Sequence, residues 1–137
     1  MQLSPYLTFN GTCEAALNFY KDIFDGEIVG LMLMGDSPME IPDDAKNRMM
    51  HATFNFGSSS FMASDSMPGQ DAPDCSNITM SLGTNDLTAT NTTFAALAAG
   101  GRINMPLEDT FWGARFGMLT DKFGINWMIN CELPKAE

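Results

Sequence analysis

The sequence has few cations, and this scarcity excludes several kinds of partner. Lys and Arg number 7 against 17 Asp and Glu, so the 137 residues carry a formal net charge of −10. A nucleic-acid-binding protein needs a basic surface to neutralise phosphates, and an anionic membrane surface repels a chain of this charge. We therefore expect no nucleic-acid or membrane partner, whereas a neutral or cationic small molecule is compatible with the charge.

Long apolar runs and paired cysteines are also missing. No run approaches the roughly 20 apolar residues of a membrane-spanning helix. The N-terminal residues show no basic stretch followed by an apolar one, so no secretion signal is predicted. The three cysteines, Cys13, Cys75 and Cys131, are widely spaced and odd in number. This pattern favours reduced thiols in a cytoplasmic protein over a disulfide framework or a zinc knuckle.

Hydrophobic residues make up 45% of the chain, which is enough for a packed core. Apolar residues at helical spacing predict a first helix over Cys13–Phe24, with Thr12 as its N-cap and Gly26 as its left-handed end. A second helix is predicted to begin after Asp86 and to stop at Gly100-Gly101. Strand patterns surround both helices, at Tyr6–Asn10, Glu27–Met34, His51–Phe56, Phe61–Asp65, Asn77–Gly83, Arg102–Leu107, Arg115–Thr120 and Asn126–Cys131.

The two halves of the chain repeat one order of elements, which is strand, helix and three strands. They also match by residue, since Leu7 corresponds to Leu82 and Gly26 to Gly101. An internal repeat of this kind predicts two copies of one supersecondary unit. We predict an α+β fold of two βαβββ modules that form a cupped mixed sheet. The expected boundaries are residues 1–66 for the first module, 67–75 for a linker and 76–137 for the second.

Side chains alternate between the two faces of each predicted strand. In the strand around His51, the residues expected to pack on a helix are Met50, Ala52, Phe54 and Phe56, and those expected on the opposite face are Met49, His51, Thr53 and Asn55. The same parity gives an inner face that holds Tyr6, Thr8, His51, Thr53, Asn77, Thr79, Arg115 and Met128. Trp112 is expected at the rim of this face, and Trp127 in the core. Such a mixed, Met-lined surface suits an amphipathic organic ligand.

Several of these residues have two interpretations each. His51 is the single histidine of the sequence. It is either a functional residue, as a general base or lone metal ligand, or a hydrogen-bonded histidine that supports the sheet. Arg115 either binds an anionic ligand or forms a salt bridge with one of the acids. Trp112 and its neighbour Phe111 either stack on a planar ligand or fill a dimer interface.

Other candidates favour a structural interpretation. Tyr6 and Thr8 can donate hydrogen bonds to a ligand or simply be solvated. Cys13 and Cys131 lack a basic partner in the sequence, which predicts buried, inert thiols. The acidic residues of the long connection at 35–47 are typical of a solvated loop rather than of a metal site.

Several segments resemble a known superfamily. They are Pro5–Phe9, Asn18–Phe24, Met50–Ala52, Gly101–Met105 and, above all, Asp109–Asn130, which begins D-T-F-W-G-A-R-F-G. The chain resembles the vicinal oxygen chelate superfamily of glyoxalases, bleomycin-resistance proteins and extradiol dioxygenases, and within it the PhnB-like branch. The resemblance implies the cupped sheet and a homodimer, but no single reaction.

The superfamily's metal ligands lie on the first and last strand of each module. Carried onto this sequence, the resemblance places them at Pro5 or Tyr6, near Met62 or Ser64, at Asn77 and at Met128. None of these is a histidine or a carboxylate, which are the side chains such a metal needs. We therefore predict no metal or other cofactor at the inherited positions.

Two functions follow from this sequence. The first is a PhnB-like small-molecule binding protein whose site includes Tyr6, Thr8, Asn77, Trp112, Arg115 and Met128. The alternative is a metal-dependent lyase, isomerase or dioxygenase-type enzyme with a non-standard site around His51, assisted by Glu108.

Overall fold

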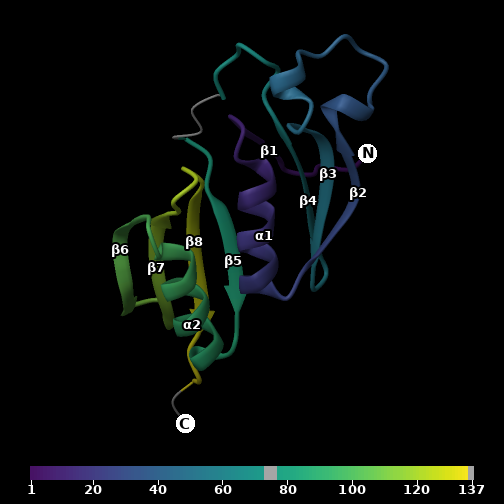
Figure 1. The fold of residues 1–137 in the computed structure, drawn as a ribbon. Coiled ribbons are helices and arrows are strands. Elements are labelled where there is room, and N and C mark those ends of the chain that lie inside the picture. Colours follow the sequence, from purple (N-terminus) through teal and green to yellow (C-terminus); the bar gives the residue numbers. More distant parts are fainter. Residues whose placement is uncertain (73–76, 136–137) are drawn as a thin grey trace. The chain divides into compact units, whose positions relative to one another are not determined.

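A computed structural model describes residues 1–72 and 77–135 of the chain. The chain divides into two compact units, Met1–Pro73 and Asp74–Glu137. The described part of each unit contains a four-stranded sheet and one α-helix, in the predicted order (Figure 1). Residues 73–75 of the predicted linker, and with them Cys75, lie outside the described residues.

The first unit begins with the strand β1 (Tyr6–Phe9), the helix α1 (Cys13–Phe24) and the strand β2 (Glu27–Leu33). Two short 3-10 turns, Met34–Asp36 and Asp43–Ala45, lead into β3 (Met49–Phe56) and β4 (Ser59–Asp65). The order across the sheet is β1-β4-β3-β2. β1 runs parallel to β4 and the other pairs are antiparallel, so the sheet is mixed.

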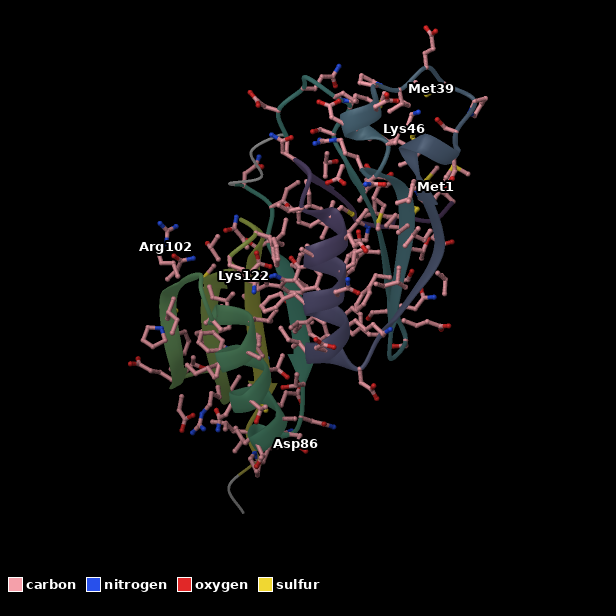
Figure 2. The ribbon with its side chains drawn as sticks, in the orientation of Figure 1. Met1, Met39, Lys46, Asp86, Arg102 and Lys122 are labelled. Atoms are coloured by element: carbon pink, nitrogen blue, oxygen red, sulfur yellow. The ribbon has the colours of Figure 1, made fainter. Side chains whose placement is uncertain are left out.

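The second unit repeats this topology. Its elements are β5 (Met80–Thr84), α2 (Leu87–Ala98), β6 (Arg102–Asp109), β7 (Ala114–Thr120) and β8 (Asn126–Glu132). Their order in the sheet is β5-β8-β7-β6, with β5 parallel to β8. In Figure 1, α2 lies in front of β7 and β8, and Figure 2 marks Asp86 at its N-terminal end. The two βαβββ modules predicted from the sequence are therefore confirmed. The two α-helices have 12 residues each, and the described part of the chain contains no helix that could cross a membrane.

The core of each unit lies between its helix and its sheet. In the first unit, Tyr20 of α1 is fully buried and contacts Phe54 and Phe61 with ring centroids 6.4 and 6.1 Å apart. Edge-to-face contacts of this kind add to the stabilisation that burial of the rings provides. In the second unit, Trp127 of β8 is 1% exposed, as the alternation of the strand predicted.

The ends of α1 differ from the prediction. The Thr12 side chain makes no capping hydrogen bond. The buried Asp65 carboxylate caps the N-terminus of α1 instead. It accepts hydrogen bonds from the backbone N–H groups of Cys13 and Met49, at 3.0 and 2.9 Å. At the other end, Asp25 and not Gly26 adopts the left-handed conformation, with φ at 51°. A long-range contact thus replaces the predicted N-cap, and the left-handed C-terminal residue lies one position earlier than predicted.

The glycines that match in the repeat, Gly26 and Gly101, have the same structural role. A Cβ atom at Gly26 would collide with the ring of Phe54 and lie 2.9 Å from the Asn55 carbonyl oxygen. A Cβ atom at Gly101 would collide with the Thr120 carbonyl oxygen. Each glycine lets the strand after a helix lie close against its neighbour, which explains why the residue recurs.

The predicted alternation holds in β1 and β8 but fails at the start of β3. Met49, expected on the face away from the helix, is 1% exposed, and its sulfur lies 3.4 Å from the Cys13 sulfur. The pairing of β3 with β2 shifts register between Val29 and Leu33, next to this point. Such irregularities change which face a residue occupies, and strict parity along a strand cannot anticipate them.

Candidate functional site

Each sheet has one face that packs on the helix of its unit and a second face directed away from it, which we call the helix-distal face. Tyr6 and Thr8 of β1 lie on the helix-distal face of the first unit, since Leu7 and Phe9 between them are buried. Met62 of β4 pairs with both Tyr6 and Thr53, so these three share this face. The grouping of Tyr6, Thr8 and Thr53 predicted from parity is thus found within this unit.

His51 and Tyr6 are in direct contact on this face. The Tyr6 hydroxyl lies 3.2 Å from His51 Nδ1, and the two ring centroids are 5.8 Å apart. Tyr6 is 46% exposed, so the pair is accessible to a solute. A phenol that shares a proton with an imidazole can exchange it with a bound molecule, which is the arrangement that general acid–base chemistry needs.

The described residues do not gather a metal-binding cluster around His51. Across residues 1–72 and 77–135, no group of three or more His, Cys, Asp or Glu side chains could hold a metal ion. Glu108, the predicted assistant of His51, belongs to β6 of the other unit, where it pairs with Phe116.

In the second unit, the helix-distal face carries paired rows of side chains from β7 and β8. The pairs are Phe116 with Asn130, Met118 with Met128, and Thr120 with Asn126. Met128 lies on this face, as predicted, and is near its middle. The apolar centre of the face is thus flanked by polar groups at both ends.

Trp112 lies beside one end of these rows. It belongs to the turn before β7, which is closed by a hydrogen bond from the Gly113 N–H to the Thr110 carbonyl oxygen. The indole Nε1–H donates to the Asn130 side-chain oxygen at 3.1 Å, and the ring contacts Phe116 edge-on with centroids 5.6 Å apart. Trp112 is nevertheless 53% exposed. Its neighbour Phe111 is 98% exposed and meets it edge-on at 5.1 Å.

A hollow of about 510 Å³ adjoins the indole. Its lining includes Trp112, Asn130 and Glu132, and it is completed by Gly113, Ala114, Leu133, Pro134 and Lys135. This volume falls within the range of ligand pockets, roughly 300–1,000 Å³. The hollow offers an aromatic face, a side-chain amide and one charge of each sign.

Arg115 is not on the face predicted for it. It pairs with Cys131, which is buried, and the next residues of the same parity, Gly117 and Leu119, are buried as well. Arg115 therefore belongs to the helix side of the sheet, at its end. Its Nε donates to the Asp109 carboxylate at 2.8 Å, and this hydrogen bond raises the pKa of the Arg115 guanidinium. The salt-bridge interpretation of Arg115 is confirmed.

Asn77 does not occupy the strand predicted for it. β5 begins only at Met80, which pairs with Trp127 of β8, and Asn77 lies in a turn three residues before that strand. Ile78, which the alternation with Asn77 and Thr79 directs toward the opposite, helix-packed face, is 63% exposed. The alternation of polar and apolar residues begins at Asn77, whereas the pairing of this segment with β8 begins only at Met80.

The cysteines that the structure describes, Cys13 and Cys131, are both buried free thiols. Burial, together with the nearby charges of Asp65 and Glu14, raises the pKa of Cys13 from 9.0 to about 12. A thiol that stays protonated at neutral pH is a poor nucleophile. The prediction that these two thiols are structural is consistent with this environment.

Sequence reasoning missed some residues that line the hollows. Asn130 has the parity of Met128, which predicts the correct face, but it was not recognised as the partner of Trp112, because their contact joins a turn to a strand 18 residues away. Arg102 and Asn104 of β6 were not singled out. Their relevance depends on the register between β6 and β7, which is shifted twice along the pair.

The fold is that of the glyoxalase/bleomycin resistance/dioxygenase proteins. A glyoxylase/bleomycin resistance protein/dioxygenase domain from Frankia sp. EAN1pec superposes with a TM-score of 0.68 over 96% of this chain and 97% of its own. The two proteins share only 12% sequence identity, so this likeness concerns the fold alone.

The family is defined more narrowly by the sequence. The model of the family described as 3-demethylubiquinone-9 3-methyltransferase matches residues 1–130, and the chain belongs to this PhnB-like family. Protein PA1353 from Pseudomonas aeruginosa is 41% identical, with a TM-score of 0.88 over 98% of this chain and 99% of that one. Protein YjdN of Escherichia coli K12 is 36% identical over 95% of both chains. The PhnB protein from Bacillus cereus is 29% identical, with a TM-score of 0.82 over 96% and 99%.

Proposed function

We propose that this protein binds a small, planar, amphipathic organic molecule at the Trp112 hollow of its second unit. The observation that carries the proposal is the exposed indole of Trp112, which is held over the helix-distal face by Asn130 and adjoins a hollow of about 510 Å³. A planar ligand stacked on the indole would remove apolar surface from water on both partners.

The charge of the site favours a neutral or cationic ligand. Glu132 lines the hollow, and an aromatic face next to a carboxylate attracts an organic cation. Lys135 opposes this locally, but the chain carries a net charge of −10, which raises the local concentration of cations. The glyoxalase/bleomycin resistance proteins that share this fold support a binding role for the hollow.

The test uses the two tryptophans as a matched pair. The Trp127→Phe variant leaves Trp112 as its single indole, and titration with N-methylquinolinium should quench its fluorescence saturably. By calorimetry, Trp112→Ala should lower the affinity for this probe about 10-fold, as expected from the loss of a desolvated stacking contact. Trp127→Phe should bind the probe as the natural protein does. Unchanged binding by Trp112→Ala would refute the proposed site.

The Tyr6–His51 contact favours a second function, an enzyme of the lyase, isomerase or dioxygenase type. Its chemistry would use the proton shared over 3.2 Å between the Tyr6 hydroxyl and His51 Nδ1. Metal analysis of protein purified without a histidine tag separates the two functions. We expect substoichiometric Zn, Mn, Fe and Ni. One tightly bound metal per chain, lost in His51→Ala, would favour the enzyme instead.

We further propose a cytoplasmic homodimer. Each sheet ends in edge strands, and Phe111 and Leu31 leave large apolar surface exposed, which a second copy of the chain can cover. The buried free thiols of Cys13 and Cys131 suit a reducing compartment. Light scattering should give a mass of about twice 14.9 kDa, and a monomer at all concentrations would contradict the dimer.

A further inference from the structure

A second hollow lies at the opposite end of β7 and β8 from Trp112. It has a volume of about 400 Å³, and its lining includes Arg102 and Asn104 of β6, with Thr79, Met118, Leu119, Thr120, Gly124 and Asn126. Arg102 pairs with Thr120 at the start of β6, and Figure 2 shows its side chain extending beyond the end of the β6 ribbon. Thr120 follows Phe116 in β7 by four residue steps, or about 13 Å of extended chain.

A chain of hydrogen bonds holds these polar side chains in place. Arg102 Nε donates to the Asn104 side-chain oxygen at 2.8 Å, and Asn104 Nδ2 donates to the Thr120 hydroxyl at 2.9 Å. The Thr120 hydroxyl donates to the Asn126 side-chain oxygen at 2.8 Å. The series crosses three strands, so the orientation of the guanidinium is set by the sheet and not by solvent.

The outer edge of the guanidinium is available to a ligand. Arg102 uses only Nε within the part of the chain that the structure describes, and its Nη1 and Nη2 make no hydrogen bond or ion pair there. The other arginines have their charge or their Nη groups engaged within the chain, although Arg115, like Arg102, uses only its Nε. Arg48 binds the Ser66 carbonyl oxygen through Nε and Nη2, and Arg115 is paired with Asp109.

We infer that Arg102 is an anion subsite, which binds the carboxylate of a small amphipathic organic acid. The planar fork of a guanidinium matches the two oxygens of a carboxylate, and such charge-assisted hydrogen bonds are strong. Met118, in the lining of the same hollow, provides polarizable apolar surface for the carbon chain of the ligand.

The charge of the protein narrows the class of anion. A chain with a net charge of −10 repels a phosphate dianion about twice as strongly as a monoanion, because the energy scales with ligand charge. A single arginine with an apolar neighbour therefore selects a monocarboxylate with a hydrocarbon part. This subsite is separate from the Trp112 hollow, so the inference does not depend on the function proposed above.

The test compares hexanoate with its neutral analogue hexanamide and with inorganic phosphate. Binding is followed by the NMR resonances of the Arg102 Nε–H and the Asn104 side-chain amide in the natural protein. Hexanoate should shift both resonances saturably, with at least about 10-fold higher affinity than hexanamide or phosphate, the factor expected for one charge-assisted hydrogen bond.

Three variants identify the source of the affinity. Arg102→Gln should weaken hexanoate binding at least 10-fold, measured on the Asn104 amide, about the effect of one lost charge-assisted hydrogen bond. Arg102→Lys should recover only part of it, because the ammonium lacks the fork. Lys46→Gln removes the same charge from the exposed pair with Asp43 in the first unit and should change nothing. Equal binding of hexanoate and hexanamide, tighter binding of phosphate, or equal losses in Arg102→Gln and Lys46→Gln would overturn the inference.

Discussion

Replacement of Trp127 by Phe tests the most specific buried interaction of the second unit. The indole is 1% exposed, and its Nε1–H donates to the Asp121 carboxylate at 2.9 Å. Asp121 is itself buried, and its other oxygen accepts from the backbone N–H groups of Phe123 and Ile125, at 2.9 and 3.0 Å. Trp127 thus connects the core to the turn between β7 and β8.

The expected cost has two parts. A phenyl ring cannot donate, and a buried hydrogen bond to a charged group contributes roughly 1.5–3 kcal/mol. The smaller ring also leaves a cavity, which costs on the order of 1 kcal/mol. We therefore expect Trp127→Phe to lower the free energy of unfolding by about 3 kcal/mol.

Urea unfolding followed by far-UV circular dichroism measures this change, and the midpoint should fall while the m-value stays constant. Trp112→Phe is the matched control, because its indole is half-exposed and its loss should cost less than about 1 kcal/mol. A cycle with Asp121→Asn isolates the pair, and we expect a coupling of more than about 1 kcal/mol. A loss below 1 kcal/mol in Trp127→Phe, or equal losses in both tryptophan variants, would refute this reasoning.

Two further predictions concern the first unit. Cys13 should resist iodoacetamide in the folded protein at pH 8, as followed by mass spectrometry of its peptide, because its pKa is raised from 9.0 to about 12. The unfolded thiol loses its proton near 9 while the folded one keeps it, so stability should fall as the pH rises from about 9 to about 12; rapid labelling at pH 8 would contradict this. Gly26→Ala should lower the free energy of unfolding by more than about 2 kcal/mol, because its Cβ collides with the Phe54 ring, whereas Gly83→Ala meets nothing within 4 Å and serves as the control. Equal urea midpoints for the two glycine variants would show that the close approach at Gly26 is not rigid.

The sequence by itself determined the elements and their repetition. The bounds of α1, Cys13–Phe24, agree with the apolar spacing, and the two modules follow from the recurring order of strands and helix. Alternation also placed Trp127 in the core and Met128 on the helix-distal face. These features depend on local periodicity, which the one-dimensional pattern of side chains records directly.

The tertiary structure alone decided how α1 is capped and which residues meet. The Asp65 carboxylate reaches the N-terminus of α1 from the end of β4, 52 residues away in the chain. The sequence around Thr12 does not predict this contact, because the contact depends on how β4 lies beside β1.

The same limit applies to the candidate sites. Arg115 was assigned to the inner face because the apolar residues Phe116 and Met118 were taken to face the helix, whereas the pairing of Arg115 with buried Cys131 puts Arg115 on the helix side. Arg102 could be identified as a candidate site residue only from the structure, because the shifted register of β6 places it beside Thr120. The register between strands is a property of two distant segments together, so no pattern within either segment determines it.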